Sequence, residues 1–454
     1  MTDINEIIAK HRGKKVAVIG LGVSNIPLVR LLKTWGANIT VLDRSTELPE
    51  EFITDVALKF CCGDGYLDRL ADGGYDIIYR TPGLYPYIPQ INEAVKNGAV
   101  LSSEMELFFE LCPAPITAVT GSDGKTTTTT VISKLYEAAG YRTFLGGNIG
   151  TPLLSSVGEM TANDKVVLEL SSFQLITMVR SPETAVITNL SPNHLDVHKS
   201  YEEYGSAKKN IFRYQSAYGT LVVNADNAFT AECAGEANGK VLFFSRRSKP
   251  ENGVYKAENG DIFFAENGRE HFLFNSSEIL IRGEHNVENY MAALAAVGCE
   301  IACKYGAELA RSFGGVEHRN RLIETKNGVR FYDDSIGTSP TRTIATLSSF
   351  DEKVVLILGG YDKKISFEPL RKPVSEKAKA VFVCGHTAEK ISAALEGCGV
   401  PVTRCACFDD AFAAAAKAAK EGDAVVLSPA CASFDEFKNF AERGKRFAKL
   451  VSEL

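Results

Sequence analysis

Short apolar runs alternate with helix-length amphipathic stretches along most of this chain. The first unit of the pattern is the run Val16–Ile19, a helical stretch from Leu28 to Trp35 and a second run, Ile39–Leu42. Strand, helix and strand in this order are typical of parallel sheets that are covered by their crossover helices. The pattern therefore predicts an α/β fold.

Two interruptions divide the pattern into three predicted domains. The stretch Cys112–Pro115 precedes the apolar run Ile116–Thr120, and Phe313–Gly315 precedes the next restart. Proline and glycine clusters of this kind mark loops and boundaries. We therefore expect a Rossmann-like N-terminal domain (1–110), a central α/β domain (111–313) and a Rossmann-like C-terminal domain (314–454).

Finer features of the last two domains also follow from the pattern. Residues 218–284 contain the turn signals Asn259-Gly260 and Asn267-Gly268, which predict antiparallel hairpins appended to the central domain. A helix is expected from Val287 to Lys304. In the last domain we expect strands at Val329–Tyr332, Val354–Leu358, Ala380–Val383 and Ala424–Leu427, and a closing helix from Asp435 onward.

Composition argues against several partners and locations. A formal charge of −6 leaves no basic excess for binding a nucleic-acid backbone. The apolar runs are far shorter than the roughly 18 residues of a membrane span, and Met1–Lys15 has no apolar core of a signal peptide. We expect a monomeric cytoplasmic protein that binds neither nucleic acid nor membrane. The 11 cysteines show no metal-site spacing and are predicted to be reduced, mostly buried thiols.

The sharpest local signal is a glycine-rich loop between an apolar strand and a helix, Thr120-Gly121-Ser122-Asp123-Gly124-Lys125-Thr126-Thr127. Glycines let backbone N–H groups face an anion at the helix N-terminus, the lysine adds positive charge, and a threonine hydroxyl can bind Mg²⁺. The segment predicts a nucleotide phosphate loop and a central domain like that of P-loop ATPases. Val119 replaces the usual first glycine, and the alternative is a glycine-rich turn without function.

Glu169 and a pair of histidines are further candidates. Glu169 ends a buried strand, where α/β nucleotide enzymes place a metal ligand or a base; the alternative is an acid that caps the next helix. His194 and His198 are four residues apart, but further zinc ligands are missing nearby, so a Mg²⁺ or substrate role for one histidine is favoured over zinc. For His198 we expect a solvated loop position.

The remaining signals are weaker. Gly20-x-Gly22 lies in the first strand-to-helix turn and Asp43 ends the next strand, which indicates a nucleotide-shaped pocket or a purely structural tight turn. By composition alone, Lys208 and Lys209 are surface charges on an amphipathic helix. In the C-terminal domain, polar loops follow the strands at His318-Arg319, Asp333–Ser335 and Gly359–Lys363.

Taken in order, these motifs resemble the Mur ligases, the ATP-dependent amino-acid adding enzymes of peptidoglycan assembly. The resemblance rests on the phosphate loop, Gly147–Gly150, Leu168–Gln174, His194, Ala207-Lys208, His285-Asn286-x-x-Asn289 and His318-Arg319. The stretch Leu427–Gly444 is similar to that of the members that add D-glutamate. The resemblance implies that ATP phosphorylates UDP-N-acetylmuramoyl-L-alanine and that D-glutamate attacks the resulting acyl phosphate.

The resemblance also implies a role for particular residues. The UDP-substrate would lie on Gly22, Val23, Ser24, Asp43, Arg44, Thr81, Pro82, Gly83, Asn148 and Ser171. ATP would bind between the second and third domains, on Gly121, Ser122, Asp123, Gly124, Lys125, Thr126, Thr127, Asn286, Arg319 and Asp334. D-glutamate would contact Thr338, Lys363, Ser433, Phe434 and Phe440.

Two Mg²⁺ ions are implied as well. Thr126 and Glu169 would hold one ion, and Glu169, His194 and a carbamylated Lys208 would hold the other. Lys125, Glu169, His194 and Lys208 would form the catalytic set. The alternatives are a Mur ligase with a different amino-acid acceptor, a dinucleotide-dependent oxidoreductase that uses Gly20-x-Gly22, and a nucleotide-binding scaffold without turnover.

Overall fold

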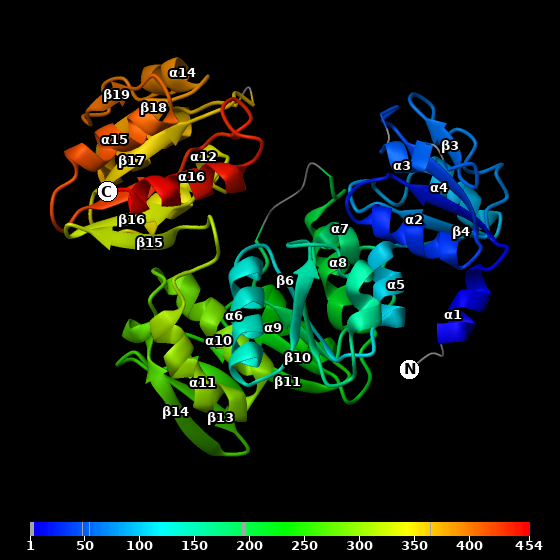
Figure 1. Ribbon diagram of the computed structural model, residues 1–454. Coiled ribbons are helices and arrows are strands. Elements are labelled where there is room, and N and C mark those ends of the chain that lie inside the picture. Colours follow the sequence, from blue (N-terminus) through cyan, green and yellow to red (C-terminus); the bar gives the residue numbers. More distant parts are fainter. Residues whose placement is uncertain (1–3, 48, 54, 192–196, 364) are drawn as a thin grey trace. The chain divides into compact units, whose positions relative to one another are not determined.

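The computed structural model describes residues 4–47, 49–53, 55–191, 197–363 and 365–454. The chain divides into two compact units. The first unit comprises Met1–Ser276 and Val287–Leu309, and the second comprises Ser277–Asn286 and Ala310–Leu454. Two sheets belong to the first unit and one to the second (Figure 1). The sheets are mainly parallel and alternate with helices, so the predicted α/β class is confirmed, while the division into three domains stays a prediction.

The N-terminal sheet is fully parallel, in the order β3-β2-β1-β4-β5. Its strands are β1 Lys15–Ile19, β2 Asn38–Asp43, β3 Lys59–Cys62, β4 Ile77–Arg80 and β5 Val100–Ser102, and its helices are α1 Ile4–His11, α2 Asn25–Thr34, α3 Glu50–Ile53, α4 Pro89–Lys96 and α5 Glu104–Leu111. Successive strand residues point to opposite faces. Ile19 therefore packs in one core and Val18 in another, and this second core continues through Phe108 of α5 to Leu168 and Val223 of the central sheet.

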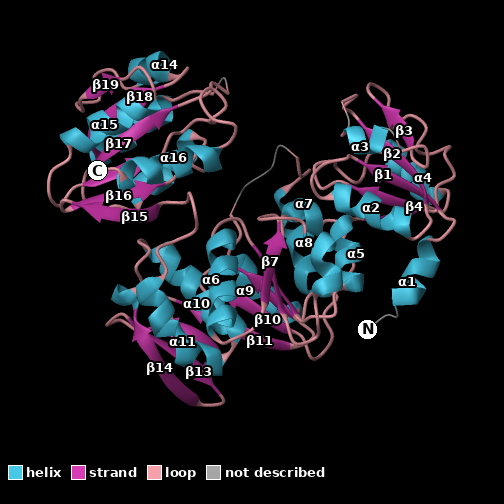
Figure 2. Cartoon of the chain, in the orientation of Figure 1, coloured by secondary structure: helices cyan, strands magenta, loops and turns pink. Residues whose placement is uncertain are grey.

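The central sheet has the order β14-β13-β12-β11-β10-β9-β6-β8-β7. Several of its strands and the helices around them can be followed in Figure 2. Its strands are β6 Ile116–Thr120, β7 Thr143–Gly147, β8 Lys165–Glu169, β9 Thr184–Ile187, β10 Thr220–Asn224, β11 Lys240–Ser245, β12 Gly253–Lys256, β13 Asp261–Glu266 and β14 Arg269–Asn275. The two predicted Asn-Gly turns join β12 to β13 and β13 to β14 as antiparallel hairpins. The prediction is wrong for β10, β11 and β12. β10 and β11 pair in parallel because α9 Ala228–Cys233 provides a crossover between them, and β11 and β12 also pair in parallel.

Helices flank the central sheet. They are α6 Lys125–Ala138, η1 Leu153–Glu159, α7 Ser172–Leu175, α8 Tyr201–Arg213, η2 Ala234–Glu236, η3 Ser276–Glu278, α10 Glu284–Val297 and α11 Cys299–Ser312. The single helix predicted over 287–304 is wrong. Gly298 has φ +86°, a left-handed conformation that ends α10, so the chain starts a new helix at Cys299.

The sheet of the second unit has the order β15-β16-β20-β17-β18-β19. Its elements are β15 Arg321–Lys326, β16 Val329–Asp333, α12 Pro340–Ser348, β17 Val354–Gly359, η4 Glu368–Leu370, α13 Arg371–Lys377, β18 Ala378–Cys384, α14 Ala388–Ala394, β19 Val402–Arg404, α15 Phe408–Ala418, β20 Ala424–Leu427 and α16 Phe440–Ser452. Leu356 packs against α12, α13 and α14, and Ile357 against α15 and α16. The four predicted strands are confirmed. The closing helix begins at Phe440 and not at Asp435, because the Asn439 side chain accepts from the Glu442 N–H and caps it there.

Two further expectations concern membranes and thiols. Within the described ranges, no helix is long and apolar enough to cross a membrane. All eleven cysteines are free, but only Cys233, Cys384, Cys398 and Cys431 are buried. The prediction of mostly buried thiols is therefore wrong. Edge positions account for part of the difference, since Cys61 and Cys62 lie on the edge strand β3.

Candidate functional site

The phosphate loop connects the end of β6 to the start of α6 in the interior of the central sheet. Gly121 and Gly124 adopt φ +148° and +80°, conformations that side chains rarely reach. A Cβ atom would also collide with Thr188 Oγ1 at Gly121 and with Asn289 Oδ1 at Gly124. Both glycines are therefore required by the loop, which opens α6 with N–H groups free of helical partners.

The end of the neighbouring strand β9 holds the loop in shape. The Asn189 carbonyl accepts from the Ser122 N–H at 3.0 Å, and Asn189 Oδ1 accepts from the Asp123 N–H at 3.0 Å. Thr188 Oγ1 donates to the Asp123 carbonyl at 2.6 Å. Sequence reasoning missed Thr188 and Asn189. Their position directly after an apolar strand was the available signal.

Two lysines converge on the same loop carbonyl. Lys125 Nζ donates to the carbonyls of Gly121 and Ser122, at 2.9 Å each, and Lys208 Nζ donates to the Gly121 carbonyl at 2.7 Å. These carbonyls therefore hold both side-chain nitrogens against the phosphate loop. The exposed Asp123 side chain lies on the same loop.

Glu169 lies at the carboxyl end of β8, the strand beside β6. Its carboxylate is buried and accepts from Thr126 Oγ1 at 2.7 Å and from Asn148 Nδ2 at 2.8 Å. Ser171 caps α7 instead, because its side chain accepts from the Gln174 N–H. The capping alternative for Glu169 is thereby removed. A carboxylate and a hydroxyl within hydrogen-bond distance are oxygen ligands of the kind that Mg²⁺ takes.

Lys208 is not the surface charge that composition predicts. It is 1% exposed on α8, whereas Lys209 is paired with Glu236. Burial, together with the charge of Lys125, holds the pKa of Lys208 well below its usual range. The helix directs Lys208 into the core beside the phosphate loop and leaves Lys209 at the surface. The sequence of a helix rich in charged residues does not show which of the two lysines is buried.

The two histidines differ in outcome. His194, and Asn193 beside it, lie outside the described residues. The solvated position predicted for His198 is wrong: its ring is 3% exposed, stacks on Phe173 at 5.3 Å and has Nε2 2.9 Å from Ser172 Oγ. Phe173 of α7 and Tyr204 of α8 enclose the ring. Phe173 is far from His198 in the sequence, so the local pattern does not show this contact.

Eight of the ten predicted UDP-substrate residues cluster at the carboxyl ends of β1, β2 and β4, whereas Asn148 and Ser171 follow β7 and β8 of the central sheet. The Asp43 carboxylate accepts from the N–H groups of Leu21 and Ser45 at 2.6 and 2.7 Å. Thr81 approaches Gly20 closely, since a Cβ there would lie 2.9 Å from Thr81 Cγ2. Gly22, Val23, Arg44 and Gly83 are exposed around this point, and Ser24 and Pro82 are half-buried.

Arg80, at the end of β4, links that loop to the central sheet. Its guanidinium is 1% exposed and donates to the carbonyls of Thr81, Pro82 and Leu84 at 3.0, 3.1 and 2.6 Å. A fourth bond, of 2.7 Å, reaches the Phe173 carbonyl on α7. Sequence reasoning missed Arg80. Its single guanidinium group therefore binds both the Thr81-Pro82-Gly83 loop and the segment that follows Glu169.

In the second unit, the expected nucleotide residues differ in exposure. Asp334 is buried, and its carboxylate accepts from Ser428 Oγ and Thr346 Oγ1 at 2.7 Å each. Burial raises the pKa of Asp334 to about 6, and the hydrogen bonds and Arg319 oppose the rise. Asn286 Nδ2 donates to the Arg282 carbonyl at 2.6 Å. Because its carboxylate is buried and hydrogen-bonded to Ser428 and Thr346, Asp334 fits a role in positioning the loop after β16 better than direct contact with a nucleotide.

The expected D-glutamate residues follow three strands of this sheet. Lys363 follows β17, Ser433 and Phe434 follow its neighbour β20, Thr338 follows β16, and Phe440 begins α16. The exposed Lys363 donates from Nζ to Thr338 Oγ1 at 3.3 Å. Ser433 is buried, whereas Phe434 and Phe440 are 65% and 37% exposed. Cation, hydroxyl groups and exposed rings therefore lie on one end of this sheet.

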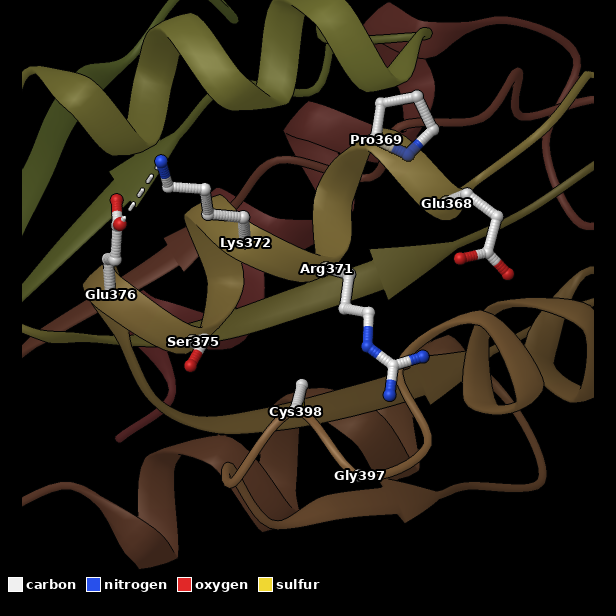
Figure 3. A pocket seen from close by; sticks show the side chains of 8 residues that line it. All are labelled: Glu368, Pro369, Arg371, Lys372, Ser375, Glu376, Gly397 and Cys398. Carbon is white, nitrogen blue, oxygen red and sulfur yellow. Dashed lines mark ion pairs between the residues drawn. The ribbon is translucent and has the colours of Figure 1, made fainter.

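A pocket of about 550 Å³ lies elsewhere in the second unit, between α13 and the turn at Gly397 (Figure 3). It is lined by charges of both signs, including Glu368, Arg371 and the ion pair of Lys372 with Glu376. None of the expected site residues lines it. We assign the candidate site to the strand ends and not to this pocket.

Comparison with known proteins decides the family. A model of the Mur ligase middle domain matches residues 119–297, and a model of the Mur ligase glutamate ligase domain matches residues 318–431. The whole chain is 50% identical to the UDP-N-acetylmuramoylalanine--D-glutamate ligase of Acetivibrio thermocellus and covers 99% of it. The chain belongs to the Mur ligase family. This Mur ligase is also 45% identical, over its full length, to the enzyme of the same name from Clostridium acetobutylicum, of which it covers 99%.

Solved structures show the Mur ligase fold independently. UDP-N-acetylmuramate-alanine ligase of Thermotoga maritima matches with a TM-score of 0.57 at 17% identity, over 97% of this chain and 99% of that one. MurF of Acinetobacter baumannii matches with a TM-score of 0.56 at 16% identity, over 98% and 92%. At such identities the likeness concerns the fold alone.

Proposed function

We propose that this Mur ligase joins D-glutamate to UDP-N-acetylmuramoyl-L-alanine, with hydrolysis of ATP, in the synthesis of peptidoglycan precursors. The observation that carries the proposal is its likeness over the full length to ligases of that name, at 50% and 45% identity. The phosphate loop and the Glu169–Thr126 pair supply the machinery for phosphoryl transfer at adjoining strand ends.

Activation of a carboxylate explains the need for ATP. A carboxylate is a poor acyl donor, so its oxygen first attacks the γ-phosphorus, and ADP leaves. The D-glutamate amine then attacks the carbonyl carbon of the acyl phosphate, an amide bond forms, and phosphate departs. Lys125 supports both the binding and the transfer by turning from the Gly121 carbonyl to the phosphate oxygens.

The residues around Glu169 fit Mg²⁺. Thr126 and Glu169 offer a hydroxyl and a carboxylate that already lie 2.7 Å apart, and both are buried. When bound there, Mg²⁺ offsets the charge on the phosphate oxygens. Two ions, with His194 and Lys208 as further ligands, belong to the proposal, and His194 lies outside the described residues.

Carbamylation of Lys208 is also part of the proposal. The lowered pKa favours a neutral amine, which can attack the carbon of CO₂ and lose a proton to form an anionic carbamate. The neighbouring Lys125 cation would stabilise that anion. An ammonium cannot bind Mg²⁺, whereas a carbamate oxygen can.

Substrate recognition divides between the two units. We propose that the UDP moiety binds Gly22, Val23, Ser24, Asp43, Arg44 and the Thr81-Pro82-Gly83 loop, and that Asn148 and Ser171 meet the pyrophosphate and sugar region of the substrate. The γ-carboxylate of D-glutamate would be bound by Lys363, Thr338 and Ser433, beside Phe434 and Phe440. Arg319, Asn286 and Asp334 would reach the base, ribose or phosphates of ATP. Cytoplasmic location and a monomeric state stay predictions.

The test is phosphate release from ATP with UDP-N-acetylmuramoyl-L-alanine and a panel of amino acids. D-Glutamate should support turnover, and L-glutamate, L-alanine, L-lysine and meso-diaminopimelate should not. Best turnover with L-lysine or diaminopimelate would replace the proposal by a Mur ligase with another acceptor. Nicotinamide absorbance in the purified protein, with no phosphate release, would favour the oxidoreductase instead.

A further inference from the structure

Three metal-binding side chains meet where β14 lies against the start of α11. His271 is on β14, Cys299 is the first residue of α11, and Cys303 follows one helical turn later. The three ligand atoms all lie within 4.8 Å of one another. All three residues belong to the first unit. None of them has a role in the amide-forming reaction proposed above.

The fold brings these residues together by two ordinary periodicities. Residues four apart on a helix share a face, so Cys299 and Cys303 point the same way. His271 is paired across the sheet with the buried Phe264 and therefore shares its face. The same face receives α11, since a Cβ on Gly306 would lie 3.3 Å from the Phe274 ring. The side chains of His271 on β14 and of Cys299 and Cys303 on α11 therefore meet between the strand and the helix.

The sulfur separation matches a tetrahedral metal. With metal–sulfur bonds of about 2.3 Å, as for zinc, two sulfur ligands of a tetrahedron stand about 3.8 Å apart. Cys299 Sγ and Cys303 Sγ are 3.8 Å apart. A disulfide would need about 2.05 Å. The separation is that of a thiol–thiol hydrogen bond and equally that of two sulfur ligands of one tetrahedral cation, so a cation can bind without moving the two sulfurs apart.

We propose that His271, Cys299 and Cys303 bind one thiophilic divalent cation, with Zn²⁺ as the representative metal. Two thiolates and one imidazole are the protein ligands of an open zinc site, and solvent completes the tetrahedron. His271 and Cys303 are exposed and Cys299 is half-buried, so both the ion and a water molecule can reach the site. The bound ion would fasten the β13–β14 hairpin to α11.

The surroundings are compatible with a cation. The Glu266 carboxylate acts on Cys299 electrostatically, and Lys240, its ion-pair partner, partly opposes it. Burial and the neighbouring Cys303 raise the pKa of Cys299 to about 11. Binding therefore displaces a proton from this sulfur, as metal binding to thiols does generally.

Cobalt(II) is a suitable probe, because tetrahedral cobalt thiolates absorb visible light. The full-length protein, stripped of metal and kept in a non-thiol reductant, should take up one equivalent of Co²⁺ with these bands, and Zn²⁺ should displace it. Cys299→Ser with Cys303→Ser should abolish the bands. His271→Ala, at an exposed position where folding is unaffected, should keep thiolate bands but lower the affinity at least about tenfold, since even outer partners of metal ligands contribute that much.

The matched control replaces another pair of cysteines that are close in sequence, Cys405→Ser with Cys407→Ser, and should bind Co²⁺ like the wild type. A circular dichroism spectrum verifies the fold of each variant. Bands that survive the Cys299/Cys303 double variant, bands lost in the Cys405/Cys407 control, or an unchanged affinity in His271→Ala would each overturn the proposal. A wild-type protein that binds no Co²⁺ under reducing conditions would overturn it as well.

Discussion

Replacement of Arg80 by methionine tests whether one buried cation supports the first unit. The substitution keeps most of the side-chain volume and removes the donors to the carbonyls of Thr81, Pro82, Leu84 and Phe173. The carbonyls of Thr81, Pro82 and Leu84 share the two hydrogens of Nη1, and the Phe173 carbonyl takes one from Nη2, so the set counts as about three full hydrogen bonds. At about 1.5–3 kcal/mol each for a charged donor, they give roughly 4.5–9 kcal/mol. Burial of the cation offsets part of this sum.

The offset can be estimated from the titration of Arg80. Burial lowers the pKa of Arg80 from 12.5 to about 10, and at about 1.4 kcal/mol per unit this is roughly 3 kcal/mol. The lower end of the difference is about 1.5 kcal/mol, and a buried carbonyl that loses its donor costs about 1–3 kcal/mol by itself. We expect Arg80→Met to lower the free energy of unfolding by at least about 1.5 kcal/mol.

Urea titration followed by circular dichroism measures this loss. Arg30→Met is the matched control, because Arg30 is exposed in its ion pair with Glu51 and should change stability by less than about 1 kcal/mol. An Arg80→Met protein within 1 kcal/mol of the wild type would refute the reasoning. Because Arg80 also holds the Thr81-Pro82-Gly83 loop, the folded variant should show a raised KM for the UDP-substrate and an unchanged KM for ATP.

Four further outcomes are expected. Lys125→Ala should lower kcat by roughly 10²–10³ while urea unfolding stays near that of the wild type, and near-normal turnover would remove the phosphate-loop assignment. Glu169→Gln should raise the Mg²⁺ concentration for half-maximal activity at least about tenfold, and an unchanged Mg²⁺ titration would contradict a ligand role. Lys208→Ala should lose at least about a hundredfold in kcat and Lys209→Ala about twofold at most, a contrast that equal activities would exclude. Burial raises the pKa of Glu104 from 4.5 to about 7, so the favourable contribution of this carboxyl group to stability is present below pH 4.5 and is lost as the pH rises through 7. Glu104→Gln should therefore be more stable than the wild type by up to about 3 kcal/mol at pH 8 and should show no gain at pH 4.5. Urea unfolding at both pH values measures the difference.

Local signals were enough to predict the phosphate loop and most strands. The Gly121–Thr126 segment carries its own turn residues, and apolar runs such as Val354–Leu358 mark buried parallel strands by themselves. Burial that depends on distant neighbours was not predictable in this way. Lys208 reads as a surface residue, because only the packing of α8 against the loop after β6 removes it from water.

The same reason explains two other differences. His198 looks like a loop residue, but α7 and α8 supply the rings that enclose it. His271 precedes Cys299 by a turn and a whole helix, so the spacing of the cysteines alone shows no metal site. Where a site is assembled from separate elements, the sequence shows which residues could take part, and only the fold shows which of them lie together.

The core that joins the N-terminal and central sheets has a consequence for synthesis of the chain. Ile7, Phe108, Leu168 and Val223 belong to one continuous cluster of buried side chains. On the ribosome, the N-terminal segment appears first, and α5 can then contact α1 but not η1, its other neighbour, until residues 153–159 have been made. The cluster as a whole is complete only when Val223 has been added, after more than 200 residues of translation. During that interval the nascent chain exposes part of an apolar helix that a chaperone can bind.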